Sequence, residues 1–205
     1  MSHSTRSAAI LAGGRATRFG GQDKGALLVD GRAILDRQLE ALAPLTDDVL
    51  IVGDLAPRTT DDAALHPRII HDIVPGCGPL GGLHAALSAA RGEAVFLAAC
   101  DMPYLSSAFV AHLFSFAGDD AEVVVPQSER GYHPLCAVYT RACLEPVAAR
   151  LGERRLKMRE LLDSVRTRVV PIEDIRRFGD PEWLLTNVNT PADYAGLEAL
   201  QDHKL

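Results

Sequence analysis

The chain alternates short uninterrupted apolar runs with segments whose apolar positions recur at helical spacing. The runs are too short for helices and are bounded by polar residues or glycine, so we expect strands buried on both faces. They cover residues 8–12, 48–52, 68–71 and 93–100. Helices are predicted over residues 33–43, 80–90 and 106–116. This alternation favours a mainly parallel sheet with helices on both faces, an α/β protein.

The second half of the chain has a less regular pattern. We expect strands over residues 122–126, 135–139 and 168–171 and helices over 142–151 and, opened by a basic run, over 154–162. Thr190 and Pro191 are typical of the start of a last helix, as its cap and its first residue. Residues 55–66 carry proline, threonine and paired aspartates and are expected to be irregular or partly helical.

Length and composition predict one domain over residues 1–205, with residues 1–7 as a disordered polar lead. A chain of 205 residues with 47% apolar content can bury a full core. Its net charge of −6 argues against nucleic acid or an anionic membrane as a partner. Because we find no signal peptide and no apolar segment of about 18 residues, we expect a cytoplasmic protein. The four cysteines form no C-x-x-C pair and are expected to be free thiols.

A glycine-rich loop, residues 13–25, directly follows the first predicted strand. Backbone N–H groups approach an anion closely at glycine, and Arg15, Arg18 and Lys24 add full positive charges. The loop therefore favours a cradle for a nucleoside triphosphate, with a flexible surface loop as the alternative. It matches neither G-x-G-x-x-G nor G-x-x-x-x-G-K-[ST], since glycine and not a hydroxyl residue follows Lys24.

Two aspartates stand at the ends of predicted strands. Ligands of open α/β sheets bind beyond the carboxyl ends of the strands, and Asp101 follows the most apolar strand of the chain. Asp101 is therefore our candidate ligand for Mg²⁺, which one or two carboxylates hold together with substrate phosphates. A cap of the following turn is the alternative for Asp101, and Asp72 taken alone is more often a turn residue.

Residues 11–24, L-A-G-G-R-A-T-R-F-G-G-Q-D-K, resemble the signature L-A-G-G-x-x-x-R-[MF]-G-G-x-D-K of the molybdenum cofactor guanylyltransferases, a family of nucleotidyltransferases. Further similar segments are C-D-M-P-Y at 100–104, H-P-L at 133–135, G-E-R-R at 152–155 and N-V-N-T-P at 187–191. The resemblance implies a three-layer α/β/α Rossmann-like nucleotidyltransferase fold with a mixed, mainly parallel sheet.

The same resemblance implies an activity and its residues. The enzyme would transfer GMP from GTP to molybdopterin-bound molybdenum cofactor and release pyrophosphate, with Mg²⁺ on Asp101. The implied nucleotide-binding residues are Leu11, Ala12, Gly13, Gly14, Arg15, Lys24, Asp72 and Asp101. Arg18, Lys24 and Asp101 are the implied catalytic residues, and His133, Arg155, Asn187 and Asn189 are the implied acceptor-binding residues. An accessory GTPase and recipient molybdoenzymes are implied partners.

Several of these residues have an ordinary structural alternative. Asn187 and Asn189 can simply shape a turn, His133 taken alone is more often structural, and Arg155 can belong to a solvated charged face. Gly53 and Asp54 stand where the family often has an asparagine that contacts the nucleotide. The alternative functions are a related transferase that uses CTP or a sugar-phosphate acceptor, and a non-catalytic GTP-binding module of the same fold.

Overall fold

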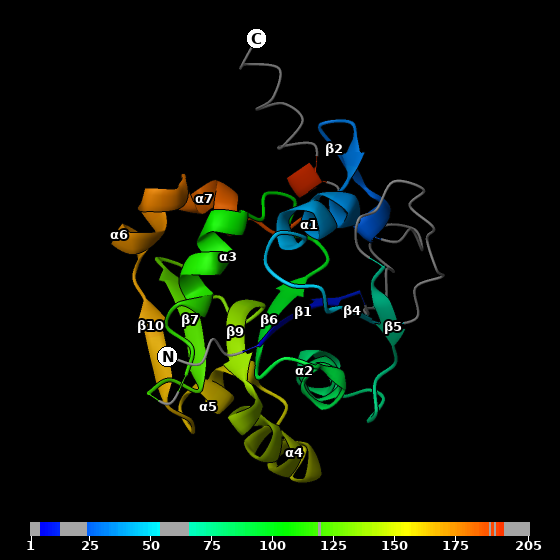
Figure 1. Cartoon of the computed structure of the whole chain (residues 1–205), viewed down its shortest axis with the longest axis vertical. Helices are drawn as coiled ribbons and strands as arrows, with labels where there is room; N and C mark the ends of the chain where they lie inside the picture. Colours follow the sequence, from blue (N-terminus) through cyan, green and yellow to red (C-terminus); the bar gives the residue numbers. More distant parts are fainter. Residues whose placement is uncertain are drawn as a thin grey trace.

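Figure 1 shows the computed structural model, which describes residues 5–12, 24–53, 66–118, 120–188, 190 and 192–194. Its main feature is an eight-stranded sheet in the order β10-β7-β9-β6-β1-β4-β5, with β8 paired to β7. The strands are β1 (Arg6–Leu11), β4 (Val49–Val52), β5 (Arg68–Ile70), β6 (Ala94–Ala99), β7 (Val123–Ser128), β8 (Gly131–Tyr132), β9 (Cys136–Thr140) and β10 (Thr167–Val170). A separate hairpin joins β2 (Leu28–Val29) to β3 (Arg32–Ala33).

Most neighbouring strands of the sheet run parallel. The strands β5, β4, β1 and β6 are parallel to one another, and β10 is parallel to β7. The strand β9 lies antiparallel between β6 and β7, so β7 has the same direction as β6. The carboxyl ends of six strands therefore lie along one edge of the sheet, which we call the carboxyl edge. The predicted mixed, mainly parallel sheet is confirmed.

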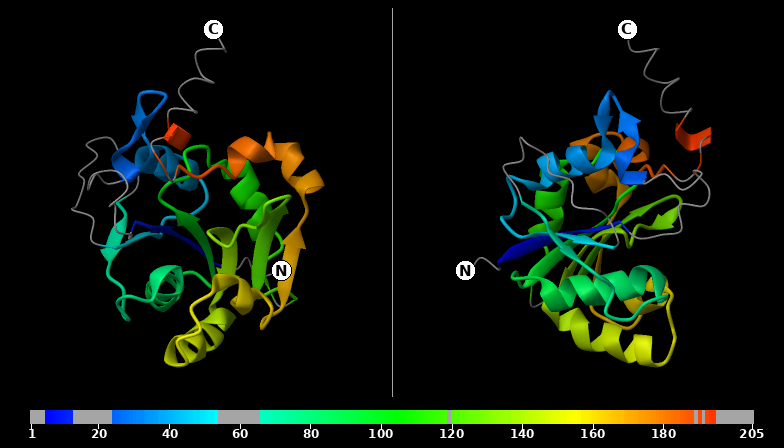
Figure 2. Two further views of the ribbon diagram at one scale, coloured as in Figure 1. Left: turned by 180° about the vertical axis from the view of Figure 1, so that it is seen from behind. Right: turned by 90° about the vertical axis from the view of Figure 1, so that its right-hand side faces the viewer.

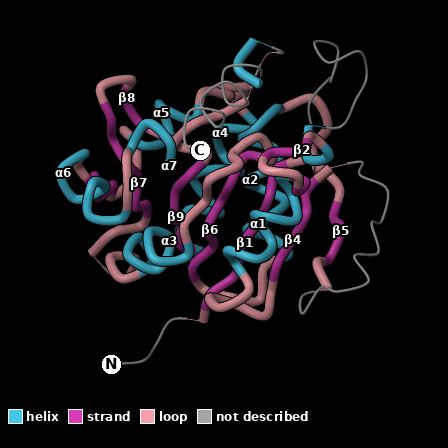
Figure 3. Tube along the Cα trace, turned by 90° about the horizontal axis from the view of Figure 1, so that it is seen from above, coloured by secondary structure: helices cyan, strands magenta, loops and turns pink. Residues whose placement is uncertain are grey.

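Helices cover both faces of this sheet (Figures 2 and 3). One face carries α1 (Ile34–Leu42) and α3 (Ser107–Phe114), and α6 (Ile172–Ile175) and α7 (Pro181–Leu184) pack into the same core. The other face carries α2 (Gly78–Ala89), α4 (Leu144–Gly152) and α5 (Met158–Leu162). Three short 3-10 helices complete the described elements: Lys24–Ala26, Arg141–Cys143 and Arg176–Phe178. The expected three-layer α/β/α fold is confirmed.

Alternate residues of the central strands supply the two cores. Ala8 and Ile10 of β1 face the core under α1 and α3, whereas Ala9 and Leu11 face the core under α2 and α4. A strand places successive side chains on opposite faces, so a strand covered on both faces must be apolar throughout. This geometry explains why the strands of the first half were recognisable as continuous apolar runs.

Several boundaries differ from the sequence predictions. The first strand begins at Arg6 rather than residue 8, so Arg6 and Ser7 belong to β1 and not to the polar lead. Arg6 pairs with Ala94 in the parallel ladder, which satisfies backbone groups that a disordered lead would leave to water. Part of the basic run forms a turn, since α5 begins only at Met158. The elements β8, α6 and α7 were not predicted.

The sequence offers Ser106 and Ser107 as caps of α3, and Ser106 is the cap, because it accepts a hydrogen bond from the Phe109 backbone N–H at 3.4 Å. All four cysteines are free. Across the described ranges, no helix combines the length and the apolar character needed to cross a membrane. Residues 54–65, which include most of the segment expected to be irregular, lie outside the described residues.

A buried carboxylate ties the strands together at the opposite, amino edge of the sheet. Asp48 is 6% exposed and accepts hydrogen bonds from the Ser7 hydroxyl at 2.6 Å and the Arg91 backbone N–H at 2.8 Å. Its other oxygen accepts from Nε and Nη2 of Arg68 at 3.1 and 2.6 Å. Burial raises the pKa of Asp48, but these hydrogen bonds and the Arg68 charge outweigh it, so the net pKa lies below the ordinary value of 3.8.

We predict that Asp48→Asn lowers the free energy of unfolding by about 1–3 kcal/mol at neutral pH, because buried donors lose a charged acceptor. The folded pKa lies below the unfolded one, so this stabilisation is complete above pH 3.8 and is lost as pH falls through the folded pKa. Urea unfolding of both proteins against pH measures the difference. A difference that stays constant into strong acid would contradict the role of the charge.

Gly92 leaves no space for a side chain beside the first strand. A Cβ at this position would lie 2.6 Å from the Arg6 carbonyl carbon and 2.7 Å from the Ser7 nitrogen, and both are backbone atoms. The Gly92 N–H also donates to the Ser7 hydroxyl at 2.8 Å. The turn before β6 can therefore approach β1 this closely only with glycine.

We expect Gly92→Ala to destabilise the fold by about 1–3 kcal/mol or more, since the clash must move backbone rather than a flexible side chain. The matched control is Gly152→Ala, where a Cβ meets nothing within 4 Å. Thermal unfolding of the two variants tests the prediction. Equal melting temperatures would show that the close approach is not needed.

Candidate active site

The first strand, β1, ends at the carboxyl edge between its neighbours β4 and β6. The Ala12 N–H donates to the Val52 carbonyl at 2.8 Å, and the Leu11 carbonyl accepts from the Cys100 N–H at 3.1 Å. The glycine-rich loop therefore begins between the ends of β4 and β6. Its residues Gly13, Gly14, Arg15 and Arg18 lie outside the described residues, and so does the side chain of Lys24.

Asp101 stands at this edge, directly beyond the central strand β6. It is 7% exposed, and its Oδ1 accepts a hydrogen bond from Nδ2 of Asn187 at 2.8 Å. Its backbone carbonyl accepts from the Val188 N–H at 2.9 Å. Two predicted site residues that lie 86 positions apart in sequence are therefore in direct contact.

Gln38, a residue that the sequence analysis did not single out, stabilises the turn that carries Asp101. Gln38 of α1 is fully buried, and its Nε2 donates to the carbonyl oxygens of Ala99 at 2.7 Å and Met102 at 3.1 Å. The two hydrogen bonds fix the backbone on both sides of Asp101. The sequence did contain a sign of this role. Gln38 is a polar residue on the apolar face of a predicted amphipathic helix, and a polar group buried there needs a hydrogen-bond partner.

Asp72 and the start of α2 lie beside the end of β1. A Cβ at Gly81 would be 4.0 Å from Oδ2 of Asp72, and one at Gly82 would be 2.8 Å from Cδ2 of Leu11. The two glycines therefore let the helix pack closely against the loop after β5 and against β1. The helix α2 has 12 residues and no acidic residue in its first turn. Its N-terminal N–H groups and dipole favour a negatively charged ligand at this edge.

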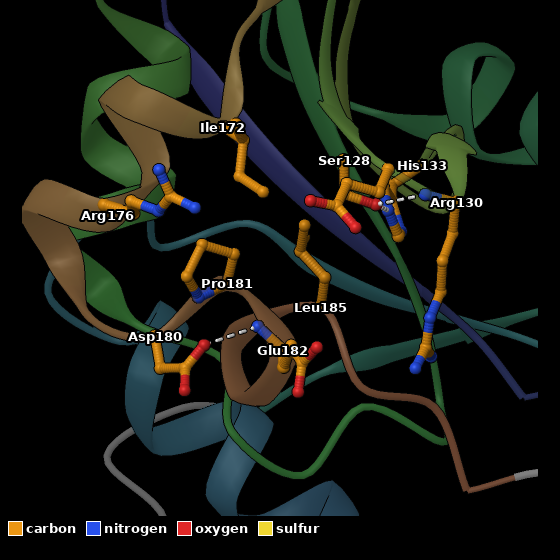
Figure 4. Close-up of a pocket in the computed structure, with 10 residues that line it drawn as sticks. Ser128, Arg130, His133, Ile172, Arg176, Asp180, Pro181, Glu182 and Leu185 are labelled. Carbon is orange, nitrogen blue, oxygen red and sulfur yellow. Dashed lines mark hydrogen bonds between the residues drawn. The ribbon is translucent and has the colours of Figure 1, made fainter.

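His133 lies in a second part of the same edge, in the wall of a cavity of about 210 Å³ (Figure 4). The cavity is bounded by the β7–β8 hairpin, by α6 and the following turn, and by α7. The His133 Nε2 is 2.7 Å from the Ser128 hydroxyl. Burial lowers the pKa of His133, and the nearby positive charge of Arg130 lowers it further, so the neutral ring is favoured near pH 7.

Of the other predicted acceptor residues, neither Arg155 nor Asn187 is among the described residues that line this cavity. Arg155 lies in the turn between α4 and α5, with Nη1 3.4 Å from Glu153 and Nη2 3.5 Å from Glu160. Its side chain is 55% exposed and is not among the described residues that line the cavity. Asn189 lies outside the described residues. The structure thus joins Asp101 and Asn187 directly, places Asp72 near Leu11, and places His133 apart from Arg155.

The donor set at Asp101 is compatible with Mg²⁺. Within the described residues, no group of three or more histidine, cysteine or acidic side chains forms an all-protein metal site. Mg²⁺ does not require one, because it keeps several waters and is commonly held by one or two carboxylates together with substrate phosphates. The buried Asp101 carboxylate at the end of a central strand is one such ligand.

The sheet, the glycine-rich loop and the carboxylate beyond β6 are those of a nucleotidyltransferase. Residues 8–169 match the model of the MobA-like NTP transferase domain. The chain belongs to the MobA-like NTP transferase family, which confirms the resemblance found in the sequence.

Individual relatives agree with this assignment. The chain is 34% identical over 191 residues to the molybdenum cofactor guanylyltransferase of Desulfosudis oleivorans, covering 93% of each protein. The crystal structure of molybdopterin-guanine dinucleotide biosynthesis protein A from Archaeoglobus fulgidus has the same fold, with a TM-score of 0.78, 23% identity and coverage of 96% of this chain and 99% of that one. A Mycobacterium tuberculosis protein solved as a complex with manganese matches at TM-score 0.61 and 18% identity, with coverage of 95% and 98%.

We predict that Asn187→Ala lowers the free energy of unfolding by about 1–3 kcal/mol, because it removes a donor from a buried carboxylate. The control is Asn187→Asp, which places a second carboxylate against Asp101 and should cost more at neutral pH, with the excess falling in acid. Chemical denaturation of both variants measures these effects. Wild-type stability in both would show that the Asp101 contact does not hold the segment.

Proposed function

We propose that this protein transfers GMP from GTP to the molybdopterin-bound molybdenum cofactor, forming the guanine dinucleotide cofactor and pyrophosphate. The observation that carries the proposal is the contact between Asp101 and Asn187 at the carboxyl edge, beside the start of the glycine-rich loop. It joins two segments of the guanylyltransferase signature in one place. The relatives named molybdenum cofactor guanylyltransferase support the choice of substrates.

The nucleotide occupies the half of the edge formed by β5, β4, β1 and β6 in this proposal. Arg15, Arg18 and Lys24 bind the triphosphate, together with backbone N–H groups of Gly13 and Gly14 and with the chain at Leu11 and Ala12. The carboxylate of Asp72 accepts from the ring N–H and the amino group of guanine. The packing of Asp72 and Leu11 around the start of α2 supports this assignment.

Asp101 would hold the Mg²⁺ ion, and the amide of Asn187 fixes the orientation of that carboxylate. Bound Mg²⁺ supplies Lewis-acid polarisation of the α-phosphate and neutralises charge on the departing pyrophosphate. Asn187, which contacts Asp101, and Asn189 bind the acceptor near its phosphate in this proposal. His133 and Arg155 are the further acceptor-binding residues of the proposal, and Arg155 must then exchange its contacts with Glu153 and Glu160 for the acceptor.

The reaction requires little covalent help from the protein. An oxygen of the acceptor phosphate bonds to the α-phosphorus of GTP, the α–β phosphoanhydride bond breaks, and pyrophosphate takes the electron pair. The nucleophile is already anionic, so no general base is needed and His133 is not assigned as one. The barrier comes from repulsion between anions, which positioning and the cations of the loop reduce.

The other expectations extend this proposal. The protein acts in the cytoplasm, and an accessory GTPase and recipient molybdoenzymes are its expected protein partners. A cytidylyl- or sugar-phosphate transferase and a non-catalytic GTP-binding module remain the alternatives to be tested. Competition among GTP, CTP and UTP with Mg²⁺ separates the first, and pyrophosphate release in the presence of molybdenum cofactor separates the second.

We expect Asp101→Ala to reduce pyrophosphate release by about 100-fold or more while the protein stays folded, since a group that stabilises the transition state is lost. Asp101→Asn should also be defective, because an amide carries no charge for the metal. The matched control is Asp163→Ala, at an exposed aspartate after α5. Near-normal turnover of Asp101→Ala would refute the proposed metal role.

A further inference from the structure

The cavity beside His133 opens a short distance from the proposed reaction centre. Leu185 lines it, and Asn187, whose amide contacts Asp101, follows two residues later. Two residues span at most about 7 Å between Cα atoms, so the cavity wall and the Asp101 contact are close neighbours. The cavity is lined by residues of the β7–β8 hairpin. Figure 3 shows β7 on the far side of β9 and β6 from β1, the strand that precedes the glycine-rich loop.

The lining of the cavity combines an apolar floor with charged side chains. Figure 4 shows Ile172, Pro181 and Leu185 between Arg176 on one side and the Ser128–His133 pair on the other. Such a floor suits a flat, weakly polar ring rather than a phosphate chain. The Ser128–His133 contact closes the hairpin side of the cavity with a neutral pair.

The charged side chains of this lining do not neutralise one another. In the part of the chain that the structure describes, neither Arg176 nor Glu182 makes a side-chain ion pair or hydrogen bond, and the same is true of Glu129. Asp180 is different, because its carboxylate caps α7 by accepting from the Glu182 backbone N–H at 2.9 Å. The Arg130 side chain, which also lines the cavity, likewise makes none, so four charged groups there are available to a ligand that offers both hydrogen-bond donors and an acceptor.

The volume of the cavity limits the size of the ligand that it can hold. Pockets for drug-sized ligands commonly measure about 300–1,000 Å³. A cavity of about 210 Å³ is smaller, so it suits one ring system of a larger molecule whose remainder extends toward Asp101. A complete nucleotide does not fit this description.

We infer that this cavity binds the pterin ring system of the acceptor, with Arg176 and Glu182 as specificity-determining residues. The edge of a pterin carries a ring carbonyl, a ring N–H and an amino group side by side. A carboxylate such as Glu182 accepts from the two donors, and the guanidinium of Arg176 donates to the carbonyl or stacks on the ring. The inference rests on the proposed function, since it places the acceptor's ring while its phosphate lies at Asp101.

The test uses Arg176→Ala and Glu182→Gln in the full chain. Loss of a hydrogen bond to a charged group costs enough to weaken binding about tenfold or more. We expect the KM for the molybdenum cofactor acceptor to rise by about that factor, with the KM for GTP unchanged and kcat changed little. Arg177→Ala and Glu173→Gln are the matched controls, because these neighbours do not line the cavity.

A second measurement does not depend on turnover. Quenching of the fluorescence of unsubstituted pterin should report binding to the wild type and to both controls, and weaker binding to both test variants. Pterin should also compete with the acceptor and not with GTP. Wild-type pterin affinity or acceptor KM in both variants, or competition of pterin with GTP, would overturn the inference.

The failure of the proposed function has a different signature. A wild type that forms no dinucleotide cofactor, yet binds pterin in a manner sensitive to Arg176 and Glu182, would refute the transferase activity and leave the pterin site standing. A wild type that forms the cofactor, together with variants that keep its acceptor KM, would refute the cavity assignment alone.

Discussion

The contact between Asp101 and the Asn187–Val188 segment is the interaction on which the site depends. One side-chain bond and one backbone bond join the end of β6 to the chain that follows α7. They add to the packing of Leu184 and Leu185 in the core under α1 and α3, and they hold the segment after α7 against the end of β6. These two hydrogen bonds therefore fix the relative positions of two segments that the proposed function assigns to the nucleotide and the acceptor.

The two edges of the sheet have different physical roles. At the amino edge, Asp48 gathers donors from Ser7, Arg68 and Arg91, and Gly92 allows the chain to pack against β1 without a side chain between them. The donors of Ser7, Arg68 and Arg91 each have Asp48 as a protein partner, which suits a structural link. At the carboxyl edge, by contrast, charged groups such as Glu182 and Arg176 lack protein partners within the described residues. The Asp48 contacts thus lie at the edge opposite to the proposed ligand site.

The sequence was most informative where burial is complete. The strands β1, β4 and β6 are covered on both faces, so their apolar runs predicted them directly. Ser7 was assigned to the polar lead because it is a polar residue at the start of the apolar run. It belongs to the buried strand because its hydroxyl donates a hydrogen bond to Asp48. The α7 helix has only four residues, too few for a periodic signal, although Asp180 before Pro181 is typical of a helix start.

The sequence predicted only those parts of the site in which a recognisable motif directly follows a predicted strand. The place of Asp101 follows from the rule for parallel strand ends, and its contact with Asn187 agrees with two motifs of one family. The cavity had no such signal, because its lining comes from a hairpin and from two helices that are short and separated in sequence. Gln38 was overlooked because a polar residue on a helix gives no indication of the distant carbonyl groups it binds.

The reversed strand β9 divides the carboxyl edge into two parts. On one side stand β6 and β1 with the glycine-rich loop, and on the other stand β7 and β10 with the hairpin and α6. The strands of each part pair with β9 and not with the strands of the other part, so insertions or substitutions in the β7–β8 hairpin need not disturb the strand β1. Under the proposed function, evolution can therefore exchange the acceptor of such an enzyme while the part of the sheet assigned to the nucleotide is inherited unchanged.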